Sequence, residues 1–357
     1  MAGLVPAIHV FCLRQTEDVD VRHEAGREAC GLSIMRRILI VVVALAVVIA
    51  AALAGMLAFG TSGTPQPLAS LGAPFRSVDF SDLPSVQTLS VSDRSPIAYR
   101  AWLPKAPAAE PPLVVIAIHG SSAQSASIHP LGKALSAEGI PVYAPDIRGH
   151  GGTGVRGDID YGGELDDDLA DFTTMVRGKY PNAKLVLMGF SSGGGYVLHV
   201  AATPLGKMFA RTVLLSPMLG AFAPTYRQDG NYAKPFIPRI IALAVLDHIG
   251  IHAFDHSTTL LLAIDPARGD VLVGHYSWLL MRAFGTGDYA DDLRKAQTPL
   301  AVVVGEKDEL FYADKFAPTI GAVRPGVPVT IVPGLSHTAL TVDGSAVPAI
   351  LAAVRGP

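Results

Sequence analysis

Short apolar runs alternate with amphipathic stretches over most of the chain. Seven runs rich in Val, Ile and Leu predict strands, because they are too short for buried helices and end in Gly, Pro, Asp or His. They lie at 97–103, 113–120, 141–147, 184–190, 211–217, 300–308 and 329–337. Apolar residues spaced by three or four predict helices at 128–138 and 164–179. Apolar strands alternating with helices predict an α/β fold with a mostly parallel sheet covered on both faces.

The strand pattern stops between about residues 218 and 297. This stretch holds nine of the 25 aromatic residues of the chain, among them Tyr226, Phe236, Phe254, Tyr276 and Trp278. We expect an inserted cap, an element that excludes water and holds apolar substrates. The alternative is that these aromatic side chains fill only the core of the cap itself.

An uncharged run, Ile38 to Phe59, precedes the predicted fold. Its 22 residues would span about 33 Å as a helix, against a hydrocarbon core of about 30 Å. We therefore predict a transmembrane anchor at 36–59. Arg36 and Arg37 stand directly before the apolar run, so the positive-inside rule places the bulk of the chain outside the cytoplasm, in the periplasm of a bacterium. A cleaved signal peptide, which would give a secreted protein, is the alternative.

The other boundaries follow from composition. Residues 1–35 show no periodicity and are interpreted as an N-terminal tail, or as the product of a start codon assigned too early. Residues 60–76 are rich in Gly, Pro and Ser, which is typical of a linker. One folded domain is then expected over 77–357, a length that a single large α/β domain can reach.

Charge and cysteine content exclude one class of binding partner and one kind of covalent link. The formal net charge of −3 and the pI of about 6.4 provide no basic surface for phosphates, so we expect no nucleic-acid partner. The two cysteines, Cys12 and Cys30, both precede the apolar run, so the predicted domain forms no internal disulfide.

A glycine-rich turn follows the predicted strand at 184–190. Gly189, Ser191 and Gly193 fit the pattern G-x-S-x-G, and a plausible helix comes next. In this context the pattern predicts a strained strand-to-helix turn that exposes Ser191 as a nucleophile, with small neighbours to permit it. A phosphate-binding loop is excluded, because no Lys-Ser or Lys-Thr pair follows the glycines.

A serine nucleophile needs a base, and the base needs an orienting acid. Asp308 and His337 each lie at the end of a predicted strand, in the chain order serine, acid, histidine that this kind of site requires. Glu306 and Glu309 are the rivals of Asp308. For the oxyanion, we expect backbone N–H groups of Ser192 and of Ser121, which follows His119-Gly120.

From about Val86 to its end, the chain resembles the α/β-hydrolase superfamily. The motifs HGSS, PDIRGHGGTG, GFSSGG, GEKD and GLSH occur in that order, as in the monoacylglycerol lipase, lysophospholipase and serine aminopeptidase-like branch. The resemblance implies a triad of Ser191, Asp308 and His337, an oxyanion hole at Ser121 and Ser192, and an acyl-enzyme without a cofactor. Lipase-like members usually have His and Met where this chain has Phe190 and Ser192.

Two other patterns point to different chemistry. Residues 149–154 fit the dinucleotide pattern G-x-G-x-x-G, but no helix is predicted directly after them. His248, His252 and His256 are spaced by four, with Asp247 and Asp255 beside them, as metal ligands on one helix would be. Gly250 interrupts that helix, so we expect no metal site.

The sequence thus predicts a membrane-anchored serine hydrolase of carboxylic esters, with small acyl lipids or other apolar acyl esters as substrates. Cleavage of amides or peptides by the same site is the closest alternative. A binding module of the same fold without catalysis is the other.

Overall fold

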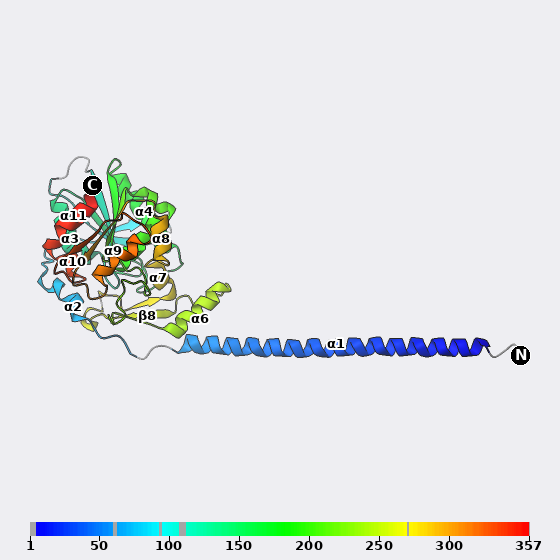
Figure 1. Cartoon of the computed structure of the whole chain (residues 1–357). Helices are drawn as coiled ribbons and strands as arrows, with labels where there is room; N and C mark the ends of the chain where they lie inside the picture. The colour runs from blue at the N-terminus through cyan, green and yellow to red at the C-terminus, as the bar shows by residue number, and fades with distance from the viewer. Residues whose placement is uncertain (1–4, 60–62, 93–94, 107–111, 270, 357) are drawn as a thin grey trace. The chain divides into compact units, whose positions relative to one another are not determined.

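The computed structural model describes residues 5–59, 63–92, 95–106, 112–269 and 271–356, and it divides into two units at Gly60 (Figure 1). The first unit is one helix, α1 (Val5–Ala58), whose side chains are described from Leu32 onward. Since α1 begins at Val5, most of the predicted N-terminal tail is helical.

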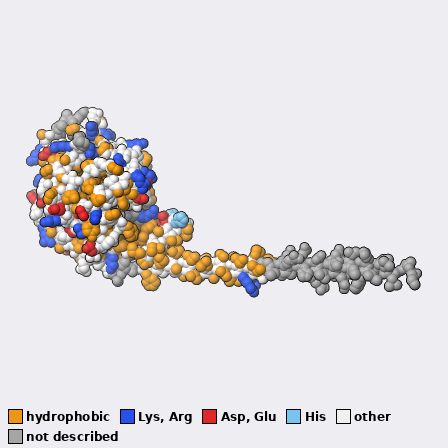
Figure 2. Space-filling model, in the orientation of Figure 1, with side chains coloured by type: hydrophobic (Ala, Val, Ile, Leu, Met, Phe, Trp, Pro, Cys, Tyr) orange, Lys and Arg blue, Asp and Glu red, His pale blue; other side chains and the backbone are white. Residues whose placement is uncertain are grey.

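The second half of α1 is strongly apolar. Among the described residues, Leu32–Ala58 is the one helical segment long and apolar enough to cross a membrane, with a mean hydropathy of 3.1 over its most apolar part. Figure 2 shows hydrophobic side chains along almost all of this segment. By length and composition, it has the properties of either a membrane span or a signal sequence.

The second unit is built on an eight-stranded sheet. In spatial order its strands are β1 (Gln87–Ser90), β2 (Pro96–Trp102), β4 (Val142–Pro145), β3 (Leu113–Ile118), β5 (Lys184–Phe190), β6 (Arg211–Leu215), β10 (Leu300–Gly305) and β11 (Val329–Val332). β1 and β2, and β2 and β4, pair antiparallel, and the remaining neighbours pair parallel. All seven predicted strands are confirmed, and with them the mostly parallel α/β sheet.

Helices cover both faces of the sheet, as predicted (Figure 1). One apolar core lies under α3 (His129–Ala137), α10 (Ala339–Val342) and α11 (Val347–Arg355). The other lies under α4 (Glu164–Lys179), α5 (Ser192–Ala202), α8 (Tyr289–Lys295) and α9 (Ala313–Gly321). The spacing of α4 explains its burial, because Leu165, Leu169, Phe172 and Val176 share one face and are at most 2% exposed.

Residues 218–297, which we call the insertion, contain a second sheet of three short strands. These are β7 (Ala233–Pro235), β8 (Thr258–Leu262) and β9 (His275–Ser277), accompanied by α6 (Ile237–His248) and α7 (Trp278–Ala283). α6 buries Leu243 and Leu246 and leaves Ile237, Ile241 and Val245 exposed. The aromatic residues divide: Tyr276 and Trp278 are buried, and Phe254 is exposed.

The expected linker at 60–76 needs correction in its second half. Residues 69–77 form a short helix, α2 (Ala69–Gly72), and a 3₁₀ turn, η1 (Pro74–Ser77). The Thr338 hydroxyl donates a hydrogen bond of 3.0 Å to the carbonyl oxygen of Leu71, and Leu68 and Leu71 pack against the domain core. Gly and Pro serve here to make tight turns in a folded segment, a use that composition cannot distinguish from a flexible tether.

Candidate active site

Ser191 lies at a sharp turn between β5 and α5. Its φ of 57° and ψ of −119° are unusual for a residue with a side chain, and such angles persist only where surrounding contacts enforce them. Here the Ser191 N–H donates to the Leu215 carbonyl, and its own carbonyl accepts from the N–H groups of Met218 and Gly195. The turn therefore fixes the hydroxyl at the carboxyl end of the sheet.

The glycines beside Ser191 permit close backbone packing. A Cβ on Gly189 would lie 2.2 Å from the Gly193 carbonyl oxygen, and one on Gly193 would lie 2.3 Å from the His119 carbonyl oxygen. Both distances are far inside van der Waals contact. The glycine-rich sequence thus brings β5, α5 and the end of β3 together around one serine.

His337 joins Ser191 to Asp308. The His337 Nε2 atom lies 3.0 Å from Ser191 Oγ, and its Nδ1 atom lies 2.8 Å from Asp308 Oδ2. Because the Asp308 carboxylate can only accept, Nδ1 carries the proton and Nε2 is free to accept the hydroxyl proton of Ser191. All three side chains are buried, and the structure brings together the three residues expected from the sequence.

Asp308 is held as a carboxylate. Its Oδ1 atom accepts hydrogen bonds from the backbone N–H groups of Leu310 and Phe311, each at 2.9 Å. Burial raises the pKa of Asp308, but the His337 imidazole and the Leu310 N–H lower it by more, so the pKa lies below 3.8. Asp308 is therefore ionised at neutral pH and can stabilise a positive charge on His337.

The rival carboxylates support the loop that carries His337. Glu309 Oε2 accepts from the backbone N–H of His337, and Glu306 Oε2 accepts from that of Gly334, both at 2.8 Å. Neither carboxylate contacts the imidazole in the described structure. The geometry therefore favours Asp308 as the partner of His337.

Two backbone amides near Ser191, those of Ser121 and Ser192, are the candidates expected from the sequence for an oxyanion hole. Ser192 is the first residue of α5, and Ser121 follows Gly120 after β3. Within the described residues, neither amide donates a hydrogen bond, whereas the next amide, of Ser122, donates to the Tyr276 hydroxyl at 2.9 Å. Ser121 rather than Ser122 therefore offers the free amide. The hydroxyls of Ser121 and Ser192 also hydrogen-bond each other.

Two tyrosines of the insertion hold this turn. Tyr276 accepts from the Ser122 N–H and donates to His150 Nε2 at 2.7 Å, and Tyr232 lies 3.0 Å from the Ser122 hydroxyl. His150 is neutral, since burial lowers its pKa well below 6.5, and its Nδ1–H points to the Arg148 carbonyl. We call Tyr232 and Tyr276 the tyrosine clamp. The sequence showed both only as aromatics of the cap.

A pocket of about 670 Å³ opens onto Ser191 and His337. Its apolar lining comes mainly from α2 and η1, from the loop after β3, and from the insertion, with Leu310 from the loop after β10. It includes Leu68, Leu71, Phe75, Phe80, Ile128, Ile264, Val271, Leu272 and Leu310. Polar groups are fewer: they lie near Ser121, at Asp265 and Arg268 in the insertion, at Arg76 in η1, and at Thr338 and Thr341 after His337. The site thus combines the linked side chains of Ser191, His337 and Asp308 with an apolar pocket large enough for a small organic ligand.

Comparison with known families identifies the family of the chain. The family model described as serine aminopeptidase, S33, matches residues 109–341, which include Ser191, Asp308 and His337. The chain belongs to this family of α/β hydrolases.

Curated relatives of this hydrolase include lipases and other enzymes of the fold. A monoacylglycerol lipase of Mycolicibacterium smegmatis is 26% identical over 252 residues, covering 68% of this chain and 85% of the relative. A non-heme haloperoxidase of Rhodococcus erythropolis is 25% identical over 236 residues, covering 61% and 82%. The chain therefore matches most of the length of both relatives.

Solved structures share the fold of the hydrolase. A soluble variant of monoglyceride lipase from Saccharomyces cerevisiae aligns with a TM-score of 0.55 at 17% identity, covering 77% of this chain and 94% of that one. Est1E from Butyrivibrio proteoclasticus, with ferulic acid bound, aligns with a TM-score of 0.54 at 18% identity, covering 76% and 100%. At these identities the similarity supports the fold alone.

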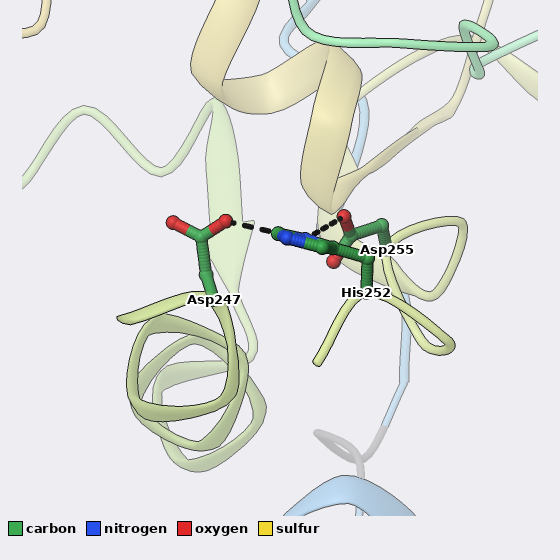
Figure 3. A group of neighbouring side chains, drawn as sticks. All are labelled: Asp247, His252 and Asp255. Atoms are coloured by element: carbon green, nitrogen blue, oxygen red, sulfur yellow. Dashed lines mark hydrogen bonds and ion pairs between the residues drawn. The ribbon is translucent and has the colours of Figure 1, made fainter. Parts of the chain in front are cut away.

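The histidines considered as metal ligands do not gather in the hydrolase. α6 ends at His248, Gly250 has a φ of 77°, and His256 pairs with Asp158. Figure 3 shows His252 between two carboxylates, with Nδ1 3.1 Å from Asp255 Oδ2 and 3.5 Å from Asp247 Oδ1. Asp247 also pairs with Arg282 at 2.8 Å. Asp247, His252 and Asp255 each offer one ligand atom and these atoms lie within 4.8 Å of one another, but the group shares no residue with the lining of the pocket at Ser191.

Proposed function

We propose that this α/β hydrolase cleaves carboxylic esters of small acyl lipids through an acyl-enzyme on Ser191. The observation that carries the proposal is the continuous contact from Ser191 Oγ through His337 to Asp308, at 3.0 and 2.8 Å, beside an apolar pocket. A buried serine has no structural need for such an arrangement, whereas a nucleophile does.

In the proposed acylation, His337 acts first as a base and then as an acid. His337 Nε2 takes the hydroxyl proton of Ser191 as Oγ bonds to the ester carbonyl carbon, and Asp308 stabilises the resulting imidazolium. The carbonyl oxygen becomes an oxyanion that accepts from the N–H groups of Ser121 and Ser192. As the tetrahedral intermediate collapses, the ester C–O bond breaks and His337 gives its proton to the departing alcohol.

Deacylation repeats these steps with water. His337 Nε2 removes a proton from water, whose oxygen attacks the acyl carbon, and the same two amides hold the second oxyanion. Collapse breaks the bond to Ser191 Oγ, which recovers its proton from His337. The product is a carboxylic acid, and the enzyme returns to its starting state.

Apolar acyl groups match the pocket lining. Aliphatic and aromatic side chains from three parts of the chain face the space beside Ser191, as a greasy acyl chain requires. The similarity to a monoacylglycerol lipase supports the same class of substrate. Amide or peptide cleavage would use the same array and is distinguished by the substrates that the enzyme accepts.

A fluorophosphonate probe should label the wild-type protein at Ser191, and Ser191→Ala should abolish labelling, because only an activated serine reacts at a useful rate. Mass spectrometry of the tryptic peptide locates the adduct. A panel of monoacylglycerols, p-nitrophenyl esters and aminoacyl amides then measures kcat/KM, with esters expected to exceed amides. Unlabelled, correctly folded protein would identify a binding module, and faster amide turnover would identify a peptidase or amidase.

We further propose that the apolar half of α1 anchors the protein and that the hydrolase domain lies outside the cytoplasm. Support comes from the length and hydropathy of Leu32–Ala58 and from Arg36 and Arg37 ahead of the uncharged run. The folded domain then occupies the region after Gly60 as one unit.

In a bacterial host, the full chain should stay in the membrane fraction through a carbonate wash, since about 30 Å of buried apolar helix resists extraction. Protease added to spheroplasts should digest the hydrolase domain, as an immunoblot against a C-terminal tag reports. A cytoplasmic protein serves as the control for intact cells. Protection of the domain would reverse the orientation, and a mature N-terminus near Gly60 would identify a cleaved signal.

A further inference from the structure

One wall of the pocket is built by the first folded residues after the apolar helix. We call residues 67–80 the proximal segment; only eight residues, 59–66, separate it from Ala58. Eight of its members line the pocket: Pro67, Leu68, Ala69, Leu71, Gly72, Phe75, Arg76 and Phe80. Most of them are apolar, and they share the pocket with Ser191 and His337.

The proximal segment is fixed at both ends. Near its start, the Leu71 carbonyl accepts from the hydroxyl of Thr338, the neighbour of His337. At its end, Phe80 stacks on the His129 ring with centroids 5.6 Å apart. Trp102 donates to His129 Nδ1 at 3.0 Å, so Nε2 carries the proton and donates to the Asp79 carbonyl at 3.2 Å. A wall held by these contacts presents a defined surface to a ligand.

We propose that the proximal segment is the wall that selects the acyl chain, with Phe75 and Leu68 as specificity-determining residues for medium and long chains. This inference rests on the proposed ester hydrolysis at Ser191. Each methylene of an acyl chain buried against apolar side chains raises affinity several-fold, whereas an acetyl group has almost no methylene surface to bury against the wall. Residues that follow the proposed anchor closely in the sequence would thus set which lipids are cleaved.

The test compares kcat/KM for p-nitrophenyl decanoate and p-nitrophenyl acetate, using the full chain in detergent. Phe75→Ala should lower the decanoate-to-acetate ratio about tenfold, and Leu68→Ala should lower it by a smaller factor, because less apolar surface is lost. The matched control is Phe254→Ala, an exposed aromatic that does not line the pocket, which should keep the ratio within about twofold.

An unchanged ratio in both wall variants would overturn the proposal, as would an equal fall in Phe254→Ala. Thermal unfolding checks that each variant is folded, and Phe75→Leu replaces Phe75→Ala if the latter is not. If the wild type hydrolyses neither ester, the proposed function fails while the wall remains testable through decanoate binding by calorimetry. If decanoate binds Phe75→Ala at least about fivefold more weakly than it binds wild type, the proposal that the proximal segment contacts the acyl chain is supported. Equal binding would reject it.

Discussion

Ser191→Ala and His337→Ala should each lower kcat/KM for ester hydrolysis by about 10⁴-fold or more, and the double variant should be little worse than either. In the proposed mechanism Ser191 and His337 act as one unit, because His337 Nε2 lies 3.0 Å from Ser191 Oγ and would accept its proton. Removing one partner therefore leaves the other without a function. Initial rates on a p-nitrophenyl ester measure the loss of activity. The rates are corrected for traces of wild-type enzyme, which would otherwise set the lowest activity that can be measured.

The non-additivity is the decisive part of this result. Multiplicative losses in the double variant would mean that the two side chains act independently, which contradicts the proposed mechanism. Phe254→Ala serves again as the control for unspecific damage, because its side chain is exposed and outside the pocket lining.

Asp308→Asn should lower kcat by about 10⁴-fold, because an amide can donate to His337 Nδ1 and thereby favour the wrong tautomer. The amide oxygen can still accept from Leu310 and Phe311, so the fold should be retained. Stopped-flow or steady-state assays of ester hydrolysis give kcat, and circular dichroism establishes that the variant is folded.

Glu306→Gln and Glu309→Gln are the comparison variants for Asp308. Both carboxylates accept from backbone N–H groups of the loop that carries His337, and an amide oxygen can replace them there. We expect losses of no more than about tenfold. If Asp308→Asn retains full activity and Glu309→Gln does not, the acid has been assigned to the wrong carboxylate.

Much of the fold could be predicted from the sequence because the main strands are apolar on both faces. β1 was not predicted, since Gln87–Ser90 holds one apolar residue and is largely exposed at the edge of the sheet. β7 and β9 are three residues long, too short for periodicity to reveal. Their pairing with β8 depends on contacts that no local pattern contains.

The site divides in a similar way. Ser191 and His337 could be proposed from local motifs and chain order, since Ser191 directly follows β5 and His337 lies in the loop after β11. The choice among Glu306, Asp308 and Glu309 depends on which side chain points toward His337. The sequence does not show this, because the three carboxylates lie within four residues of one another. The proximal segment was missed for a different reason: its Gly and Pro content is the same as that of a flexible linker.

Because of the tyrosine clamp, the insertion cannot be replaced in a chimaera without affecting the turn at Ser121. Tyr232 and Tyr276 reach from the insertion to the turn whose amide we assign to the oxyanion hole. Grafting the insertion of a relative onto this sheet, a common route to altered specificity, would release that turn unless both hydroxyls were supplied. A chimaera of this hydrolase should therefore exchange residues 119–123 and residues 218–297 at the same time, both taken from the same relative.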